Sequence, residues 1–465
     1  MKKKLIPIYK EILGDFDTPV SLYLKLNQPQ SFLLESVTGG EQVARYSFIG
    51  LDPFCSFIND GTKNLIEIEG EKFSNLANPI DELQKLVEKY KFENVDHLPC
   101  LIGGAIGFFS WETIFHIEDI SRKEKTKTSF PLAQFLFPRS LVVFDHVKRK
   151  IIIISLAEAG QEEKANTRIE RLEKLIKTPL KNTSSDFDLG PLDDPFKNVS
   201  SNYQKEDFIK AVKKVKNHIY EGDIFQLVLS QNFTCKSQKL PFDVYRKLRY
   251  INPSPYMFYF NLDDYQLIGS SPEILVRSDD NIAQVRPIAG TRPRRDKNEE
   301  KLIEELKNDE KEKAEHIMLL DLGRNDLGRV CEYDTVKTTA LMEIEKYSHV
   351  LHMSSNVTGK LAKGKTAFDL FKATFPAGTV SGAPKIKAIE IIEGLEPAER
   401  GPYAGALGYF DFRGNMDLCI IIRTILAKNK VYSVQAGAGI VADSVPEKEF
   451  EETKNKAKGM IEACL

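Results

Sequence analysis

The chain has 465 residues, of which 42% are hydrophobic, which is enough for a large core or for two to three domains. Its 65 lysines and arginines balance 67 aspartates and glutamates, so neither a basic surface for nucleic acid nor an acidic tail is expected. The N-terminus reaches Lys10 and Glu11 before an apolar run forms, which argues against a signal peptide and favours the cytoplasm.

The N-terminal part of the chain mixes short β-rich runs with helical patterns. Residues 160–177 (GQEEKANTRIERLEKLIK) predict a helix, because Ile169, Leu172 and Leu175 lie near helical spacing. Residues 178–204 gather Pro, Gly, Ser, Asn and Asp without periodicity, which is typical of a connection between two bodies. We therefore expect an N-terminal domain over 1–195 and a C-terminal domain over 196–465, with a coarse boundary and possible interleaving.

The C-terminal part carries nearly all of the unusual local sequence. A helix is predicted from Lys205 to the Glu221-Gly222-Asp223 segment, followed by a strand over 224–233 (IFQLVLSQNF). Alternating strands and helices continue to the C-terminus. We expect the chemistry in this part.

Two predicted helices carry glutamates three residues apart. Glu312 and Glu315 form one pair, and Glu449 and Glu452 form the other, with Lys456 on the same helix face. Mg²⁺ commonly takes one or two protein carboxylates and completes its shell with water and substrate oxygens. Each pair taken singly is also typical of a solvated helix face, so the pattern alone does not decide between the two.

Several segments are suited to an anionic ligand. Residues 375–392 (FPAGTVSGAPKIKAIEII) read as a small-residue loop leading into a helix N-terminus, which binds carboxylates or phosphates. The sequence Gly437-Ala438-Gly439 suggests a loop where a ligand approaches the backbone. Arg423 follows a buried-looking strand and needs an anionic partner.

The order and spacing of the C-terminal motifs resemble those of the chorismate-utilising enzymes, and most closely the anthranilate synthase component I family. The motifs are EGDIFQLVLSQ, INPSPYMFYF, GSSPEILVR, RPIAGTRPR, EHIMLLDLGRNDLGRV, FPAGTVSGAPK, GPYAGALGYF and VQAGAGIVADSVPEKEFEETKNKA. The N-terminal half matches more sparsely. The resemblance implies an α+β fold, a two-domain sandwich of mostly antiparallel sheets flanked by helices with the active site in the cleft.

The resemblance also implies roles for particular residues. Chorismate would be bound with Mg²⁺ between its ring carboxylate and the metal region Glu312, Glu315, Glu449 and Glu452. Glu273 matches the general acid that protonates the departing hydroxyl, and His352 matches the histidine of the pyruvate-loss step, with Thr379 completing the catalytic set. The implied substrate contacts are Gln226, Thr291, Tyr403, Arg423, Gly437, Ala438, Gly439 and Lys456.

Two positions distinguish reactions within this group of enzymes. Isochorismate and salicylate synthases carry a lysine where this chain has Gln226, and glutamine cannot deprotonate water. Aminodeoxychorismate synthases commonly carry an attacking lysine where this chain has Ala289. Ammonia as nucleophile and anthranilate as product are therefore favoured. Aminodeoxychorismate synthase component I stays open, since not every member has the lysine, as does a tryptophan sensor that lost turnover.

The sequence also predicts a partner and a regulator. None of the six cysteines lies in a G-x-C-x-G turn, so glutamine hydrolysis is expected from a separate amidotransferase subunit, component II. The motifs LLES and NPSPYMF resemble the family's tryptophan-inhibition site, which implies Leu34, Glu35, Ser36, Pro255, Tyr256 and Met257. Cys419 falls where the family places another contact, although a buried strand cysteine is the alternative. Trp111-Glu112 stand where relatives often have Tyr-Asp, a departure expected to affect packing or docking.

Overall fold

The computed structural model describes residues 2–36, 45–92, 95, 97–180, 190, 192–293, 299–346 and 350–465. Its strands form two long ladders that share β3 and β8, and every strand pair is antiparallel except β1 with β6. The first ladder runs in the order β6 (Tyr90–Phe92), β1 (Lys3–Leu13), β9 (Lys150–Glu158), β8 (Ala133–Asp145), β3 (Tyr46–Asn59), β2 (Ser31–Glu35), β12 (Tyr256–Leu262), β13 (Tyr265–Ser271), β22 (Thr424–Lys428), β23 (Val431–Ile440) and β11 (Gln226–Lys236).

The second ladder contains the other halves of the two shared strands, where β4 (Asn64–Ile68) pairs with β3 and β7 (Gly104–Phe109) pairs with β8. It runs in the order β5 (Glu71–Asn75), β4, β3, β8, β7, β20 (Ala406–Asp411), β21 (Met416–Ile420), β14 (Ile274–Asp279), β15 (Ile282–Val285) and β18 (Val350–Lys360). β16 (Ile288–Pro293) and β17 (Lys337–Lys346) pair with β18, and the short β10 (Ser200–Ser201) and β19 (Gly382–Ala383) pair with β11.

Hydrogen bonding between strands crosses the boundary near residue 195. β2 pairs with β12, and β7 pairs with β20, so N-terminal strands lie inside ladders that C-terminal strands continue. The apolar cluster between the ladders likewise draws Phe32 and Phe108 together with Phe258 and Leu407. The two parts of the chain therefore share one core.

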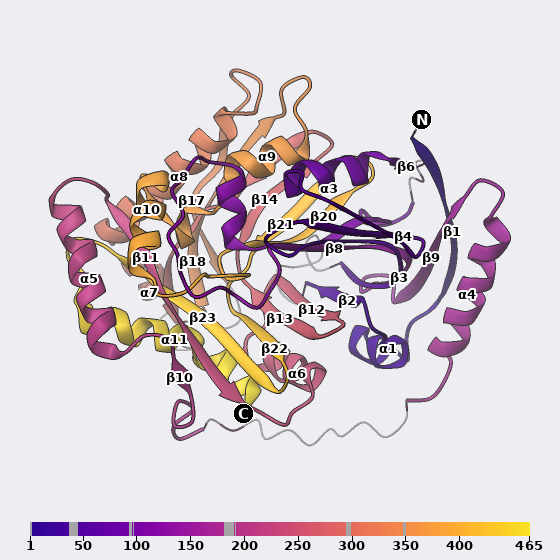
Figure 1. Ribbon diagram of the computed structural model, residues 1–465, viewed down its shortest axis with the longest axis horizontal. Coiled ribbons are helices and arrows are strands. Elements are labelled where there is room, and N and C mark those ends of the chain that lie inside the picture. Colours follow the sequence, from indigo (N-terminus) through magenta and orange to yellow (C-terminus); the bar gives the residue numbers. More distant parts are fainter. Residues whose placement is uncertain are drawn as a thin grey trace.

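Helices cover the outer faces of the ladders. α1 (Pro19–Leu26), α4 (Glu162–Ile176), α6 (Pro241–Ile251) and α11 (Pro446–Cys464) pack on the first ladder, and α10 (Lys385–Leu395) packs on its last strand, β11, and on the short β19. α3 (Pro79–Glu88) and α9 (Ala367–Thr374) pack on the second ladder. α5 (Lys205–Tyr220) and α10 lie at the opposite end of the molecule from α4 (Figure 1). In α4 the buried residues Ala165, Ile169, Leu172 and Ile176 form one stripe, as helical spacing requires.

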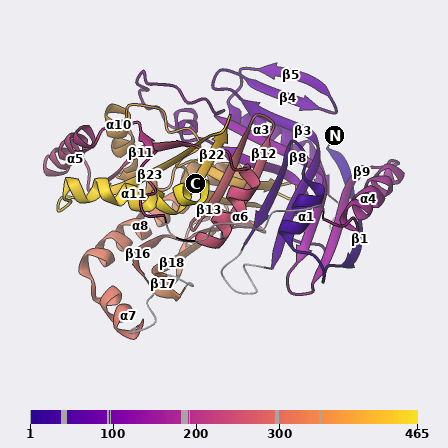
Figure 2. The ribbon, with the colours of Figure 1, turned by 90° about the horizontal axis from the view of Figure 1, so that it is seen from below.

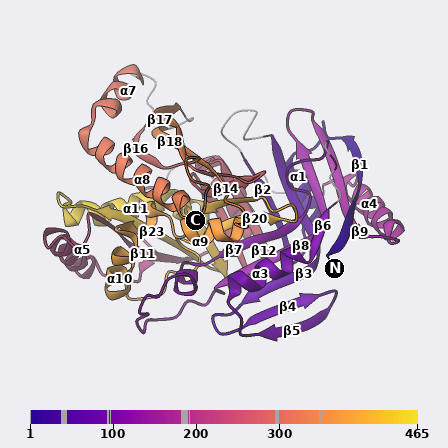
Figure 3. The ribbon, with the colours of Figure 1, turned by 90° about the horizontal axis from the view of Figure 1, so that it is seen from above.

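The remaining helices flank the candidate site. α7 (Glu299–Asn308) and α8 (Glu310–Gly328) project with β16–β18 from the rest of the molecule (Figures 2 and 3). The 3₁₀ helices η1 (Trp111–His116) and η2 (Gly378–Val380) are short connections beside it. The α+β sandwich, the helix after Lys205, the 160–177 helix and the strand near 224–233 are confirmed. No helix in the described ranges is long and apolar enough to cross a membrane.

Candidate active site

Glu273 and Thr379 form the centre of the candidate site. Glu273 immediately precedes β14, and Thr379 lies in η2, just after α9. The Thr379 Oγ1 hydroxyl donates a hydrogen bond to Glu273 Oε1 over 3.0 Å. Burial raises the pKa of Glu273 to about 8, against a smaller lowering by the Thr379 hydrogen bond and by the charge of Lys456. The carboxyl therefore keeps its proton at neutral pH and can act as a proton donor.

The Gly437-Ala438-Gly439 segment is not a loop, as the sequence suggested, but the C-terminal half of strand β23. It pairs with Ser230, Leu229 and Val228 of β11. The glycines are needed for close approach: a Cβ at Gly437 would lie 2.8 Å from Tyr403 Oη, and one at Gly439 would lie 2.8 Å from Gln226 Nε2. The loop prediction was wrong because a run of glycine and alanine occurs both in loops and in strands that other groups approach closely. The sequence alone does not show those groups.

One edge of this strand segment is open to side chains. The pairing of β22 with β23 ends where Ile425 meets Val434, so β22 does not cover Gly437 to Gly439. The Lys456 ammonium on α11 donates to the Gly437 carbonyl over 3.1 Å and pairs with Glu452 over 2.7 Å. A cation therefore lies beside a strand edge that β22 does not pair with, an arrangement suited to an anionic ligand.

Arg423 and Tyr403 complete the polar wall near this edge. Arg423 lies between β21 and β22 with φ of 52°, and its Nη1 donates to the Lys456 carbonyl over 2.6 Å. Burial lowers the pKa of Arg423, while the neighbouring Tyr403 and Glu452 raise it. Tyr403 is buried, and burial raises its pKa to about 12. The wall therefore presents a neutral hydroxyl beside two cationic side chains.

The four glutamates of the predicted metal region lie on two helices, one pair on α8 and one on α11. Gln226 reaches α8, donating from Nε2 to Glu315 Oε1 over 3.1 Å, and its buried Oε1 has no hydrogen-bond partner among the described residues. Within the described ranges, the one trio of His, Cys, Asp or Glu ligand atoms within 4.8 Å is His218, Glu221 and Asp223, at the end of α5.

The glutamates therefore do not form a closed all-protein coordination shell. An oxygen-only donor set spread over two helices nevertheless fits Mg²⁺, because this ion keeps several waters and takes few protein ligands. The unpartnered Gln226 Oε1 leaves an additional oxygen acceptor beside Glu315. The residues present fit a hydrated Mg²⁺ ion.

His352 lies in β18, on the side of the site formed by β16 and β17. It stands opposite Thr291 and Glu345 in the strand registers. Burial lowers the pKa of His352, which favours the neutral imidazole. The side chains of Thr291 and Ala289 lie outside the described residues, so only their backbone positions in β16 are placed. A Cβ at Gly290 would lie 3.2 Å from Glu312 Oε2, so the Glu312 side chain of α8 lies close to β16.

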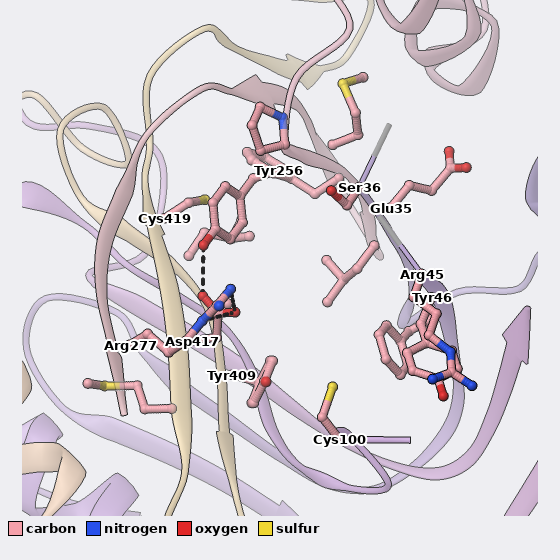
Figure 4. Close-up of a pocket in the computed structure, with 18 of the residues that line it drawn as sticks. Glu35, Ser36, Arg45, Tyr46, Cys100, Tyr256, Arg277, Tyr409, Asp417 and Cys419 are labelled. Atoms are coloured by element: carbon pink, nitrogen blue, oxygen red, sulfur yellow. Dashed lines mark hydrogen bonds and ion pairs between the residues drawn. The ribbon is translucent and has the colours of Figure 1, made fainter. Parts of the chain in front are cut away.

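A cavity of about 650 Å³ lies between the two ladders, and the seven residues predicted for tryptophan all line it. They come from the end of β2 and the residue after it, from the start of β12 and the residue before it, and from β21, which lie far apart in the sequence (Figure 4). The Glu35 carboxylate is buried and accepts hydrogen bonds from Tyr245 and from Arg249 Nε, the latter over 3.2 Å. Glu35 is therefore neutralised by residues outside the cavity lining, and Ser36 is the predicted polar contact that remains.

The cavity also contains a polar group that the sequence motifs did not indicate. Asp417 accepts from Arg277 Nε over 2.9 Å and Nη2 over 2.6 Å, and from Tyr256 Oη over 3.0 Å (Figure 4). Arg277 faces Asp417 because β14 pairs with β21. No local pattern could have found this group, since its members meet only through the pairing of strands.

The cavity and Glu273 share one strand pair. Cys419 lines the cavity and is opposite Ile274, the residue that follows Glu273. The next residue along β21, Ile420, donates its N–H to the Glu273 carbonyl over 3.0 Å. A ligand that displaces β21 would therefore also displace the main chain of Glu273.

The fold and the site define a class of protein. The family model described as chorismate binding enzyme matches residues 29–462, so the chain belongs to this family, as its motifs predicted.

Within the family, several relatives that match nearly the whole chain have the same name. Proteins named anthranilate synthase component 1 from Acetivibrio thermocellus and Aquifex aeolicus are 46% and 44% identical to this chain, covering 99% of it and 95% and 94% of their own lengths. The crystal structure of anthranilate synthase component I from Streptococcus pneumoniae TIGR4 superposes with a TM-score of 0.82 at 38% identity, over 97% of this chain and 99% of that one. MenF, the menaquinone-specific isochorismate synthase from Escherichia coli, shares the fold with a TM-score of 0.74 at 19% identity.

Proposed function

We propose that this protein is an enzyme that converts chorismate and ammonia to anthranilate and pyruvate, in tryptophan biosynthesis in the cytoplasm. The observation that carries the proposal is the Glu273 carboxyl, which accepts a hydrogen bond from Thr379 and whose pKa burial raises although Lys456 is near enough to lower it. The similarity over 99% of the chain to relatives named anthranilate synthase component 1 supports the same reaction.

Each group has a task that its environment suits. The Glu273 carboxyl donates its proton to the departing hydroxyl of chorismate as ammonia adds to the ring. Lys456, Arg423 and Tyr403, with the open edge of β23, hold the two substrate carboxylates. The neutral imidazole of His352 accepts a proton in the pyruvate-loss step that forms the aromatic ring. Gln226 cannot activate water, which leaves ammonia as nucleophile.

We assign Mg²⁺ as the cofactor. Glu312 and Glu315 on α8 and Glu449 and Glu452 on α11 would hold it, directly or through water, and it supplies charge neutralisation for the ring carboxylate of the substrate. Lys456 already neutralises Glu452 over 2.7 Å, so this lysine keeps the α11 carboxylate in place beside the substrate wall.

Ammonia is proposed to come from glutamine through a separate amidotransferase subunit, component II, as the component name of the relatives suggests. The chain alone is then expected to use ammonium salts at elevated pH, where more free ammonia is present. Tryptophan is proposed to bind the 650 Å³ cavity and to act on Glu273 through the β14–β21 pair.

The test is the fluorescence of anthranilate formed by the purified chain from chorismate, MgCl₂ and ammonium, with and without EDTA and with and without tryptophan. A signal that EDTA abolishes and tryptophan reduces is expected. Consumption of chorismate without anthranilate would instead indicate an aminodeoxychorismate synthase. Tryptophan binding without any chorismate consumption would indicate a tryptophan sensor without enzymatic activity.

A further inference from the structure

Arg400 is a buried cation that none of the proposed catalytic steps uses. It is 4% exposed, and its guanidinium makes four hydrogen bonds. Nε and Nη2 donate to the two carboxylate oxygens of Glu396 over 2.8 and 2.7 Å. Nη1 donates to the Val380 carbonyl and Nη2 also donates to the Val228 carbonyl, each over 2.8 Å. The planar fork of arginine is required for this set, since lysine presents a single ammonium.

Aromatic rings and a second carboxyl fix Arg400 from other sides. Its guanidinium carbon lies 4.2 Å from the ring centroid of Trp111 and 5.6 Å from that of Tyr403. The Glu112 side chain accepts hydrogen bonds from the backbone N–H groups of Arg400 and Gly401 over 2.8 and 3.2 Å. The N-terminal η1 helix, which carries the Trp-Glu departure from the family pattern, thus supports a residue of the C-terminal part.

The two carbonyls that Arg400 binds belong to elements of the candidate site. Val380 follows Thr379, whose hydroxyl holds Glu273. Val228 lies two residues after Gln226 on β11 and pairs with Gly439. The guanidinium therefore joins the η2 turn to the strands that border the substrate wall, and it stacks beside the tyrosine of that wall.

We propose that Arg400, supported by Trp111, is a positioning residue that sets the Thr379 hydroxyl on Glu273. This inference rests on the proposed function, because it assigns the second layer of the same site. Arg400 is not among the residues proposed to bind the substrate. It holds the Val380 carbonyl, the carbonyl holds the η2 turn, and the turn places the hydroxyl. A displacement of about 1 Å at such a point lowers a rate by about 100-fold.

The test compares pH–rate profiles at a fixed concentration of free ammonia. Arg400→Lys keeps the charge but loses the fork, and we expect kcat to fall by about 10- to 100-fold. The alkaline limb of the profile is the fall in rate as Glu273 loses its proton. Because the Thr379 hydrogen bond lowers the pKa of Glu273, weakening this bond should shift the alkaline limb to higher pH. Adding Arg400→Lys to Thr379→Val should move the limb no further, since both act on one hydrogen bond.

Two further variants separate positioning from stability. Trp111→Leu removes the stacking ring but keeps Arg400, so it should move the limb in the same direction, and it carries the test if Arg400→Lys does not fold. Lys25→Met is the matched control, because Lys25 donates to Asp17 over 2.8 Å and to the Ile176 carbonyl over 2.7 Å, away from the site. It should lower the melting temperature and leave the limb in place.

The outcomes distinguish this inference from the proposed function. Wild type that forms no anthranilate would refute the function. Wild-type activity together with an unshifted limb in folded Arg400→Lys, or additive shifts in the double variant, would refute the positioning role. The role can also be tested without turnover, from melting temperatures measured as a function of pH. The difference in melting temperature between proteins with Glu273 and with Glu273→Gln depends on pH because Glu273 titrates. Arg400→Lys should shift this dependence to higher pH, whereas a purely structural role would leave it unchanged.

Discussion

Replacing Thr379 by valine tests the electrostatics of the site most directly. The substitution keeps the shape of the side chain and removes the hydroxyl that donates to Glu273 Oε1 over 3.0 Å. A hydrogen bond to a charged group is worth about 1.5–3 kcal/mol, and one pKa unit corresponds to about 1.4 kcal/mol. Because Glu273 is only half-buried, we take the lower end of this range. The pKa of Glu273 should rise by about one unit, from about 8 to about 9.

The consequence is a change in the shape of the pH profile. Glu273 acts while protonated, so wild-type activity should fall as the pH rises through about 8. With the limb one unit higher, the ratio of the rate at pH 9 to the rate at pH 7 should be about fivefold larger in the variant. The assay is initial anthranilate fluorescence at saturating chorismate, with the total ammonium adjusted so that free ammonia stays constant.

Absolute rates are not the decisive quantity here, since Thr379 belongs to the proposed catalytic set and its loss can lower the rate in more than one way. A limb that stays at the wild-type position would show that the hydroxyl does not stabilise the ionised Glu273. A limb that moves downward would reverse the sign of the argument. Thr379→Ser, which restores a hydroxyl, should return the limb toward the wild-type position.

Four other expectations follow from the same contacts. Glu273→Gln should abolish turnover yet raise the melting temperature above wild type at pH 8 to 9 but not at pH 4, because a carboxyl with a raised pKa loses stability as pH rises from its unfolded value through about 8. Lys456→Met should raise the KM for chorismate by about 10- to 100-fold, which corresponds to the loss of one hydrogen bond to a charged group. The melting temperature of the variant should stay at the wild-type value. Gly437→Ala should raise that KM more than Gly439→Ala, since the first Cβ meets Tyr403, Val228 and the Leu229 carbonyl whereas the second meets only the flexible Gln226 side chain; equal effects would contradict the close-approach argument. Tyr256→Phe should raise the tryptophan concentration for half-inhibition by about tenfold, because Asp417 loses the donor that orients it; an unchanged inhibition curve would remove Asp417 from the tryptophan site.

Local sequence was sufficient for the elements whose own side chains specify them. Ile169 and Leu172 identified α4, because a helix buries residues at its own period whatever it packs on. Leu175, which the sequence grouped with them, is exposed, and Ile176 is buried in its place. The glutamate pairs of α8 and α11 were placed on helix faces for the same reason. Motif order was sufficient for the family, and the seven residues predicted to bind tryptophan line one cavity.

Tertiary structure decided what depends on neighbours from distant parts of the chain. Gly437 and Gly439 looked like a loop, because nothing in the local sequence shows that β11 pairs with them or that Tyr403 and Gln226 press against them. The raised pKa of Glu273 likewise arises from burial, which its own segment does not encode. Arg400 carries no signal in its surroundings. It became a candidate only when Trp111, Glu396 and two carbonyls from separate strands and turns met around it, since a buried charge is explained by its partners and those partners are brought together by the fold.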